Sequence, residues 1–378
     1  MRRATSVEKA GNHASVNRAH HLWPVLLACV GAGCSSAVVT GSPRDLGEDP
    51  LLLGDIMRPP SADLARDPVV VVVPGVVVST LAGSANFGSA DGSGAAAAFQ
   101  NPVGIALGGD GLLYVTEYDS SRVRRVTQDG AVTLLTRQSG FVGPFAVAWG
   151  GSDLVVQTDY DETGVKNTTT GTLWRVSLQT GVAARLVGGL GRPRGLAYLG
   201  PDTLAVADHM RGTLSTLSLP GGGLTLRASQ PLNVPIGVAA LPDGSVVVAD
   251  SANHCVRRVL ADNSVTTLAG DGVAGMIDGP GVQARFDRPI AITADSQGNV
   301  YVSDSGANHR IRRIDATGVV ESIAGNGQAG FADGPGDTAA FYGQEGLVVL
   351  PSGGVLYVAD GNSGDGADYH RIRKITLP

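Results

Sequence analysis

One stretch of the chain decides the fold, and it consists of four short segments separated by turn residues. The segments read Asp287-Arg-Pro-Ile-Ala-Ile-Thr293, Gly298-Asn-Val-Tyr-Val-Ser-Asp304, Asn308-His-Arg-Ile-Arg-Arg-Ile314 and Val319-Val-Glu-Ser-Ile-Ala-Gly325. They are rich in β-branched and aromatic residues and are bounded by Gly, Asp, Asn or Pro, which is the signal of a β-strand that ends in a turn. The stretch therefore predicts a unit of four short strands.

The same unit recurs along the chain. Close copies begin at Pro102 and Pro235, weaker copies begin at Pro144 and Pro193, and a last copy begins at Gln344, where Gln replaces the proline. Four strands in a repeat of roughly 40 to 55 residues is typical of a β-propeller blade, whereas a solenoid of that repeat length would need helices with a sustained 3.6-residue period. We therefore predict an all-β fold, a six-bladed β-propeller of four-stranded blades.

The sixth copy contains three strands, the last of them within Arg371-Ile-Arg-Lys-Ile-Thr-Leu-Pro378. A matching fourth strand lies at the other end of the domain, because Val76-Val-Val-Ser-Thr-Leu-Ala-Gly83 resembles the fourth strand Ser264-Val-Thr-Thr-Leu-Ala-Gly270. We expect the N-terminal strand to complete the last blade and to close the ring, which removes exposed sheet edges. The propeller then occupies residues 76–378.

The first 75 residues predict an export signal and a tether. Basic residues precede the apolar run Leu22-Trp-Pro-Val-Leu-Leu-Ala-Cys-Val30, which is too short to span a bilayer as a helix and is followed by small residues. That order indicates a signal peptide over residues 1–33. Residues 34–75 are proline-rich without sustained periodicity, so we predict a linker.

The end of this signal, Val30-Gly-Ala-Gly-Cys34-Ser-Ser, resembles the lipobox of bacterial lipoproteins. The resemblance implies cleavage before Cys34, lipid attachment to its thiol, and an outer-membrane location, since Ser35 follows. Gly31 departs from the pattern, which usually has Leu there, and Leu26-Leu-Ala-Cys29 offers a competing frame. Secretion without a lipid is the alternative. In either case the protein is predicted to be exported and to meet a membrane only through a lipid anchor.

Composition narrows the classes of function. The chain is 43 % hydrophobic, 16 % charged and 5 % aromatic, with 54 Gly and 20 Pro, which excludes a disordered chain and long helical bundles. The net charge is −6 and the sequence has no basic block, so nucleic acid is excluded as a partner. Three cysteines cannot form a disulfide framework. We also expect the protein to be a monomer.

Two motifs carry a resemblance to a known family. Asn253-His-Cys-Val256 and Asn308-His-Arg-Ile311 resemble the NHL repeat, with Val or Ile where the family name has Leu, and the glycine-rich links 90–99, 277–286 and 332–341 are similar to those of bacterial extracellular NHL proteins. The resemblance implies a six-bladed propeller. It does not imply one function, because members include protein-binding and RNA-binding propellers, sensor domains of receptor kinases and an amidating lyase.

The elaborate loops of this chain share one face of the predicted propeller. In a four-stranded meander, the loop between strands 2 and 3 and the link from strand 4 to the next blade emerge on the same side. Loops on a rigid scaffold are where binding usually occurs, so we predict a ligand site on this face, near the mouth of the central channel. The candidate residues are Asp161, Glu162, Lys166, Asn362, Asp365, Asp368 and Tyr369.

Three other residue types recur at equivalent positions. Carboxylates end strand 2 in every copy, and an acid before a turn usually accepts backbone hydrogen bonds from that turn, so we predict a structural role. Histidines begin strand 3 in three blades, but such positions are well over 10 Å apart against zinc–nitrogen bonds of about 2 Å, so we predict neither a metal nor a cofactor. Arginine pairs lie in strand 3, where we expect them to pair with Asp. The recurring residues are Glu117, Asp159, Asp208, Asp250, Asp304 and Asp360; His254, His309 and His370; and Arg124-Arg125, Arg257-Arg258 and Arg312-Arg313.

Together these features favour a non-catalytic binding or scaffolding propeller on the cell surface, with a protein, peptide or glycan as its ligand. The alternative is a propeller enzyme, a lyase or lactonase with a divalent metal at the channel mouth. Such an enzyme needs acidic or His ligands on the innermost strands, whereas the first strands at Val103, Ile236 and Ile290 are apolar. We therefore predict no catalytic residues.

Overall fold

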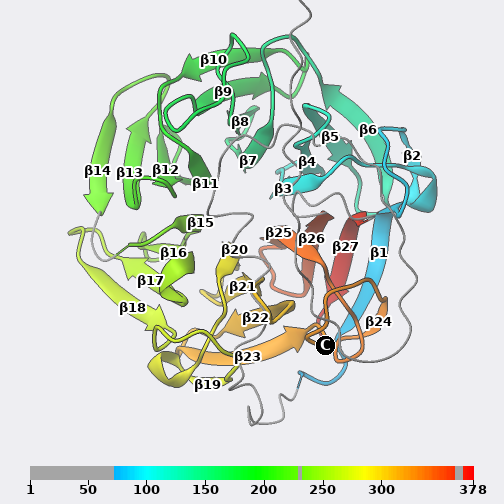
Figure 1. The fold of residues 1–378 in the computed structure, drawn as a ribbon, viewed down its shortest axis with the longest axis vertical. Coiled ribbons are helices and arrows are strands. Elements are labelled where there is room, and N and C mark those ends of the chain that lie inside the picture. Colours follow the sequence, from blue (N-terminus) through cyan, green and yellow to red (C-terminus); the bar gives the residue numbers. More distant parts are fainter. Residues whose placement is uncertain (1–71, 229–231, 362–368) are drawn as a thin grey trace, which may run out of the picture. The chain divides into compact units, whose positions relative to one another are not determined.

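The computed structural model describes residues 72–228, 232–361 and 369–378, which form six antiparallel blades around a central axis (Figure 1). The prediction of an all-β six-bladed propeller is confirmed. In these ranges no helix has the length and apolar character needed to cross a membrane.

Within each blade the four long strands follow one another outward from the axis (Figure 1). The first three blades contain β3 (Pro102–Leu107), β4 (Leu113–Glu117), β5 (Arg122–Val126) and β6 (Ala131–Thr136); β7 (Pro144–Trp149), β8 (Asp153–Thr158), β9 (Thr172–Ser177) and β10 (Ala183–Val187); and β11 (Pro193–Gly200), β12 (Thr203–Asp208), β13 (Thr213–Ser218) and β14 (Leu224–Ala228). The last three contain β15 (Pro235–Ala240), β16 (Val246–Asp250), β17 (Cys255–Val259) and β18 (Val265–Ala269); β20 (Pro289–Ala294), β21 (Val300–Asp304), β22 (Arg310–Ile314) and β23 (Val319–Ala324); and β25 (Gly343–Val349), β26 (Val355–Gly361), β27 (His370–Thr376) and β1 (Val77–Ser84).

Short elements in the links add a fifth strand to three blades, which the repeat pattern did not predict. Each two-residue strand pairs with the outermost long strand of its blade. The short strands are β2 (Gly92–Ser93), β19 (Gly279–Pro280) and β24 (Gly334–Pro335), and single 3-10 turns lie at η2 (Gly94–Ala96), η3 (Ser251–Asn253) and η4 (Gly281–Gln283).

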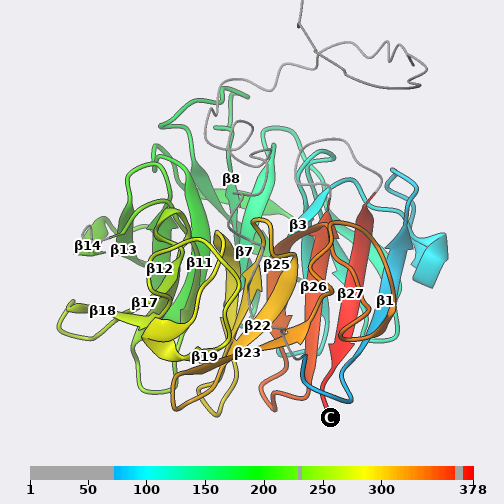
Figure 2. The ribbon, with the colours of Figure 1, turned by 60° about the horizontal axis from the view of Figure 1, so that its bottom comes forward.

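The ring closes through β1, as the sequence predicts. Figure 2 shows β1 beside β27, and the two pair antiparallel from Val77 opposite Thr376 to Ser84 opposite His370. The ladder is irregular between Thr80 and Ala82. Gly83 follows with φ +91°, and a Cβ atom there would lie 2.3 Å from the carbonyl oxygen of His370. The glycine that ends the repeated Leu-Ala-Gly segment is therefore required by a close backbone approach.

The apolar core is divided among the interfaces between blades. Six clusters of buried side chains lie in the described residues, and each joins two neighbouring blades. Phe99, Phe286 and Phe341, which end the glycine-rich links, are completely buried in three of these clusters. Because every blade depends on both neighbours for its core, the stability of the ring depends on closure.

The register of the blades defines the face on which the site is built. Pro102 pairs with Glu117 and Pro289 pairs with Asp304, so the innermost strand begins where the second strand ends. We call this side of the propeller the loop face. The innermost strands approach closely there: a Cβ atom on Gly104 of β3 would lie 2.1 Å from the Phe145 carbonyl oxygen of β7.

Candidate functional site

The carboxylates that end the second strands are buried on the loop face, and all of them except Asp159 accept backbone hydrogen bonds. The sequence predicted backbone donors in the turn that follows the carboxylate, but among the described residues only Asp208 accepts from that turn, through the Met210 and Arg211 amides. All six are at most 5 % exposed. Asp250 accepts from the Asn233 amide at 2.6 Å, and Asp304 accepts from the Asp287 amide at 2.7 Å. These amides lie just before the innermost strand of the same blade. In these five blades the carboxylate therefore holds the entry to the first strand.

In four blades a strand-3 arginine completes this arrangement, which we call the arginine clamp. In the fifth blade, Arg312 donates to Asp304 at 2.8 Å, to the Arg285 carbonyl at 3.1 Å and to Asp278 in the glycine-rich link. Burial raises the pKa of Asp304 to about 6, although the Arg312 charge opposes the rise. The equivalent pairs are Glu117–Arg124 at 3.0 Å, Asp250–Arg257 at 3.0 Å and Asp360–Arg373 at 2.9 Å. The predicted pairing of arginine with Asp is thus confirmed. These charged side chains bind one another and stabilise the blades.

The second and third blades depart from the clamp. The strand-3 position that faces Val156 in β8 is Trp174, and the one that faces Val206 in β12 is Ser215. Trp174 donates its indole N–H to Thr158 at 2.8 Å, so no strand-3 guanidinium reaches Asp159. The cations of the second blade must come from elsewhere.

Arg192 and Arg194 of the third blade supply those cations. Both donate from Nη2 to Oδ2 of Asp159, at 2.9 and 3.0 Å. Burial alone would raise the pKa of Asp159, but the Arg194 and Arg192 charges outweigh it and hold the pKa well below its usual range. The Asp159 carboxylate is therefore charged at neutral pH and is shared between two guanidinium groups.

Two further side chains complete what we call the Asp159 cluster: Tyr118, Asp159, Lys166, Arg192 and Arg194. The Tyr118 hydroxyl donates to Asp159 Oδ2 at 2.8 Å, and Lys166 Nζ donates to the Tyr118 oxygen at 2.9 Å. Burial and the Asp159 charge raise the pKa of Tyr118, so its hydroxyl keeps the proton that it donates. Lys166 Nζ also lies 5.5 Å from the Tyr118 ring centre, within cation–π range.

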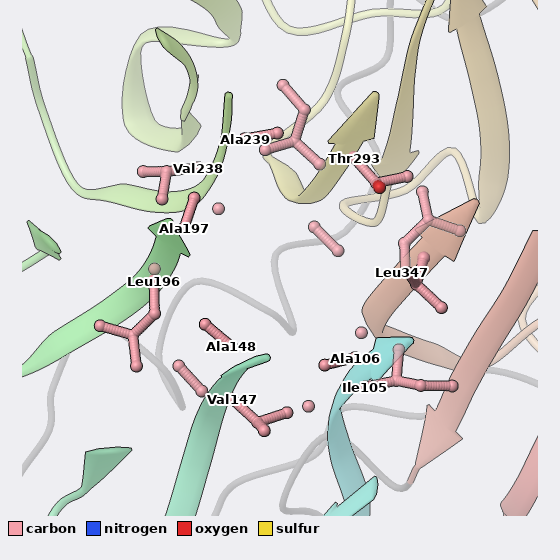
Figure 3. Close-up of a pocket in the computed structure, with 18 of the residues that line it drawn as sticks. Ile105, Ala106, Val147, Ala148, Leu196, Ala197, Val238, Ala239, Thr293 and Leu347 are labelled. Atoms are coloured by element: carbon pink, nitrogen blue, oxygen red, sulfur yellow. The ribbon is translucent and has the colours of Figure 1, made fainter. Parts of the chain in front are cut away.

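A cavity of about 290 Å³ lies along the axis, beside this cluster. Its walls come from the innermost strands of all six blades, and Figure 3 shows apolar side chains such as Val147, Leu196 and Val238 around it. Two charged residues also line it, Arg194 of β11 and Glu345 of β25. The third and sixth blades are opposite in a six-membered ring, so these charges come from opposite sides of the channel.

Arg194 and Glu345 are not among the site residues predicted from the sequence. The prediction of apolar first strands holds for the copies at Val103, Ile236 and Ile290, which line the ring without a charge. Arg194 follows Pro193 and Glu345 follows Gln344, in copies that depart from the consensus. Alignment of all six first strands on these anchor positions was the signal that could have found them.

The predicted loop residues have different surroundings. Lys166 belongs to the Asp159 cluster. Asp161 accepts from the Thr163 and Val165 amides of its own loop, and Glu162 pairs with Arg185 at 3.1 Å, so neither joins that cluster. Tyr369 stacks on Tyr342 with ring centres 4.2 Å apart. Cys34, Asn362, Asp365 and Asp368 lie outside the described residues.

Two of the recurring histidines connect successive blades. Nδ1 of His254 accepts from the Arg288 amide at 3.2 Å, and Nδ1 of His370 accepts from the Asn101 amide at 3.3 Å. In the part of the chain that the structure describes, no group of three or more His, Cys, Asp or Glu side chains is placed to hold a metal ion. The hydrogen bonds give these histidines a role in joining blades.

Aromatic side chains gather on the loop face, although they make up only 5 % of the chain. Phe87 and Phe331, which lie just before the glycine-rich links 90–99 and 332–341, are 49 % and 40 % exposed. The Phe331 ring lies 3.8 Å from the Arg371 guanidinium carbon, and Phe87 meets the His370 ring edge-on. Half-exposed Tyr118, Tyr160, Tyr342 and Tyr369 lie on the same side of the propeller.

Known proteins match both the repeat and the fold. The family model described as the NHL repeat matches residues 232–259 and 286–314, the segments that contain His254 and His309. This chain is an NHL-repeat β-propeller. The NHL propeller is 25 % identical over 344 residues to NHL repeat-containing protein 2 of Gallus gallus, which covers 84 % of this chain and 44 % of the relative. It therefore spans less than half the length of that relative.

Solved structures share the fold of the NHL propeller. An auxiliary nutrient binding protein from Bacteroides thetaiotaomicron has a TM-score of 0.66 and 18 % identity, with 79 % of this chain and 76 % of that chain covered. A streptogramin B lyase has a TM-score of 0.50 and 16 % identity, with 80 % and 98 % covered. At these identities the likeness shows the fold alone.

Proposed function

We propose that this NHL propeller is a non-catalytic binding module whose ligand docks on the loop face, over the channel mouth near the second and third blades. The observation that carries the proposal is the departure from the arginine clamp in the second blade. Four blades satisfy their carboxylate from within. At Asp159 the cations come from Lys166 in a loop and from Arg192 and Arg194 of the neighbouring blade, so charged and aromatic groups meet at the channel mouth.

The surface chemistry of the loop face supports a macromolecular or glycan ligand. Protein interfaces are enriched in aromatic residues and arginine, and hot spots favour Trp, Tyr and Arg. Exposed Phe87 and Phe331 and the stacked Tyr342 and Tyr369 supply flat apolar surface beside cations. A protein, a peptide or a glycan can use both features.

The solved structures support binding and also name the alternative. Auxiliary nutrient binding proteins with this fold are consistent with a module that holds a ligand at the cell surface. A streptogramin B lyase has the same fold, so the enzymatic alternative is kept. That alternative is a lyase or lactonase with a divalent metal at the channel mouth. Asp159, the acid nearest that mouth in the second blade, is already shared by two arginines, which favours binding.

The test of binding compares two lysines in the full-length protein. Wild type, Lys166→Ala and Lys374→Ala are screened against a glycan array and a peptide array, and affinities for the hits are then measured by calorimetry. Lys374 lies on β27 opposite Tyr357, away from the loop face, and serves as the matched control. We expect Lys166→Ala to weaken binding at least tenfold, about 1.4 kcal/mol, and Lys374→Ala to leave it unchanged.

Two outcomes would contradict this proposal. One is an equal loss of affinity in both lysine variants, because the ligand would then not be recognised at the loop face. The other is a stoichiometric divalent metal in the purified protein together with turnover of a lactone or of streptogramin B. That result would support the enzymatic alternative.

We also propose that the chain is exported and anchored through Cys34. The motif around Cys34 is the basis, and several acyl chains together anchor a protein stably where one gives only marginal binding. Cys34→Ala should move the protein from the membrane fraction to the soluble fraction, whereas Cys29→Ala should leave it on the membrane. Fractionation and mass spectrometry of the N-terminal peptide provide the measurement. Soluble wild-type protein without acyl mass, or release by Cys29→Ala instead, would refute the assignment.

A further inference from the structure

We propose that Arg194 forms a carboxylate-binding subsite inside the channel mouth, for a ligand group that joins one carboxylate to an apolar body. The inference rests on the proposed binding function and specifies the chemistry that the loop face recognises. It depends on one buried guanidinium group and on the apolar cavity beside it.

Arg194 is buried with one donor atom unused. Its side chain is 5 % exposed, and Nη2 donates to Asp159 at 3.0 Å. Nη1 is buried and has no hydrogen-bond partner among the described residues. Buried polar atoms almost always have a partner, and a guanidinium nitrogen without one needs a specific reason. An acceptor supplied by a ligand is such a reason.

The Asp159 carboxylate is already occupied by other donors. Its Oδ2 atom accepts from Arg192, Arg194 and the Tyr118 hydroxyl, and its Oδ1 atom accepts from Gln157 at 3.0 Å. The unused Nη1 atom of Arg194 must therefore donate to an acceptor other than Asp159.

Phe145 holds the guanidinium group of Arg194 in place. The guanidinium carbon lies 3.9 Å from the Phe145 ring centre, and both residues line the central cavity. Stacking on an aromatic face, together with the bond to Asp159, restrains the planar group from two sides. A restrained guanidinium with an unused donor atom, Nη1, can donate a charge-assisted hydrogen bond to a carboxylate.

The cavity beside Arg194 fits an apolar body. It measures about 290 Å³ and is lined by side chains such as Ile105, Val147, Leu196 and Leu347 (Figure 3). An apolar cavity of about 150 Å³ holds benzene, so this one has room for a hydrocarbon group about twice that size. The carboxylate would sit at Arg194 and the hydrocarbon would extend along the axis. A free organic acid and the C-terminal residue of a peptide both present this chemistry.

The experiment measures binding of four probes to the full-length protein by calorimetry. The probes are octanoate, octanamide, the tripeptide acetyl-Gly-Gly-Leu with a free carboxylate, and the same tripeptide as its amide. We expect octanoate or the peptide acid to bind at least tenfold more tightly than the matching amide. Preference for octanoate identifies a free acid as the ligand type, and preference for the peptide acid identifies a C-terminus.

Three variants connect binding to the subsite. Arg194→Gln should abolish the preference for the acid over the amide. Ala197→Leu should weaken all four probes, because Ala197 lines the cavity without touching Asp159 and the larger side chain fills the space. Arg258→Gln is the matched control, since Arg258 pairs with Asp243 in the fourth blade and neither residue lines the cavity. Thermal unfolding of each variant tests whether it is folded. If Arg194→Gln does not fold, Ala197→Leu still tests whether the probes bind in the cavity.

The result that overturns the inference is equal affinity of acid and amide in the wild type, or no binding of any probe. Equal losses in Arg194→Gln and Arg258→Gln would do the same. If the array ligand depends on Lys166 but is unaffected by Arg194→Gln, the binding function stands and the carboxylate subsite does not exist.

Discussion

Deletion of residues 76–83 is expected to lower the melting temperature of the propeller by about 10 °C or more, because it opens the ring. The segment supplies almost all of β1, which pairs with β27 and β24 and so joins the N-terminal strand to the last blade. It also removes Val76, Val78 and Ala82, which are buried at the interfaces of the sixth blade. Loss of that burial and of the ladder costs about 5 kcal/mol or more.

The control is a longer deletion from the predicted tether, residues 40–68. It removes more chain but no blade strand, so the melting temperature should change by no more than about 2 °C, as expected when stability changes by less than 1 kcal/mol. Differential scanning calorimetry measures both variants against the wild type. An unchanged melting temperature after deletion of 76–83 would show that closure through β1 does not stabilise the ring.

Arg312→Ala is expected to lower the free energy of unfolding of the propeller by about 3 to 5 kcal/mol. Arg312 is fully buried and donates to Asp304, Asp278 and two backbone carbonyls. Its removal leaves the Asp304 carboxylate buried without its cation, and an uncompensated buried charge is costly. Asp304→Ala should also be strongly destabilising, because it leaves the Arg312 guanidinium group buried without that carboxylate.

The neighbouring residue provides the matched control for this prediction. Arg313 pairs with Glu321 on the other side of the same strand, where both side chains are about one-third exposed. Exposed ion pairs contribute about 0 to 1 kcal/mol, so Arg313→Ala should change stability by no more than that. Urea unfolding curves give both values. Equal costs for the two arginines would mean that the clamp does not hold the blade.

Much of the fold could be predicted because its signals are local and repeated. A strand, a turn glycine and an anchor proline are each recognisable within a few residues, and six copies reinforce one another. Closure by residues 76–83 followed from the same comparison, since a fourth strand has the same residue pattern wherever it stands in the chain. Alternation along strand 3 likewise separated Arg312 from Arg313, because adjacent side chains point to opposite faces.

The candidate site could not be found in the same way, because it is made of departures from the repeat. Trp174 and Ser215 replace the clamp arginine, and Arg194 occupies a position that is Val or Ile in three of the other first strands. Within a single copy, each of these changes is indistinguishable from the ordinary sequence variation between repeats. Their meaning appears only when Asp159 is seen to take its cations from the next blade.

The sequence by itself therefore determined the repeat, the number of blades, the closing strand and the face that carries the elaborate loops. Only the tertiary structure decided that Tyr118, Asp159, Lys166 and Arg194 meet at one channel mouth, and that Arg194 Nη1 is left without a partner among the described residues. The physical reason is the range of the interactions. Strand and turn preferences act between near neighbours in the chain, whereas buried charges pair across blades at distances that no local pattern encodes.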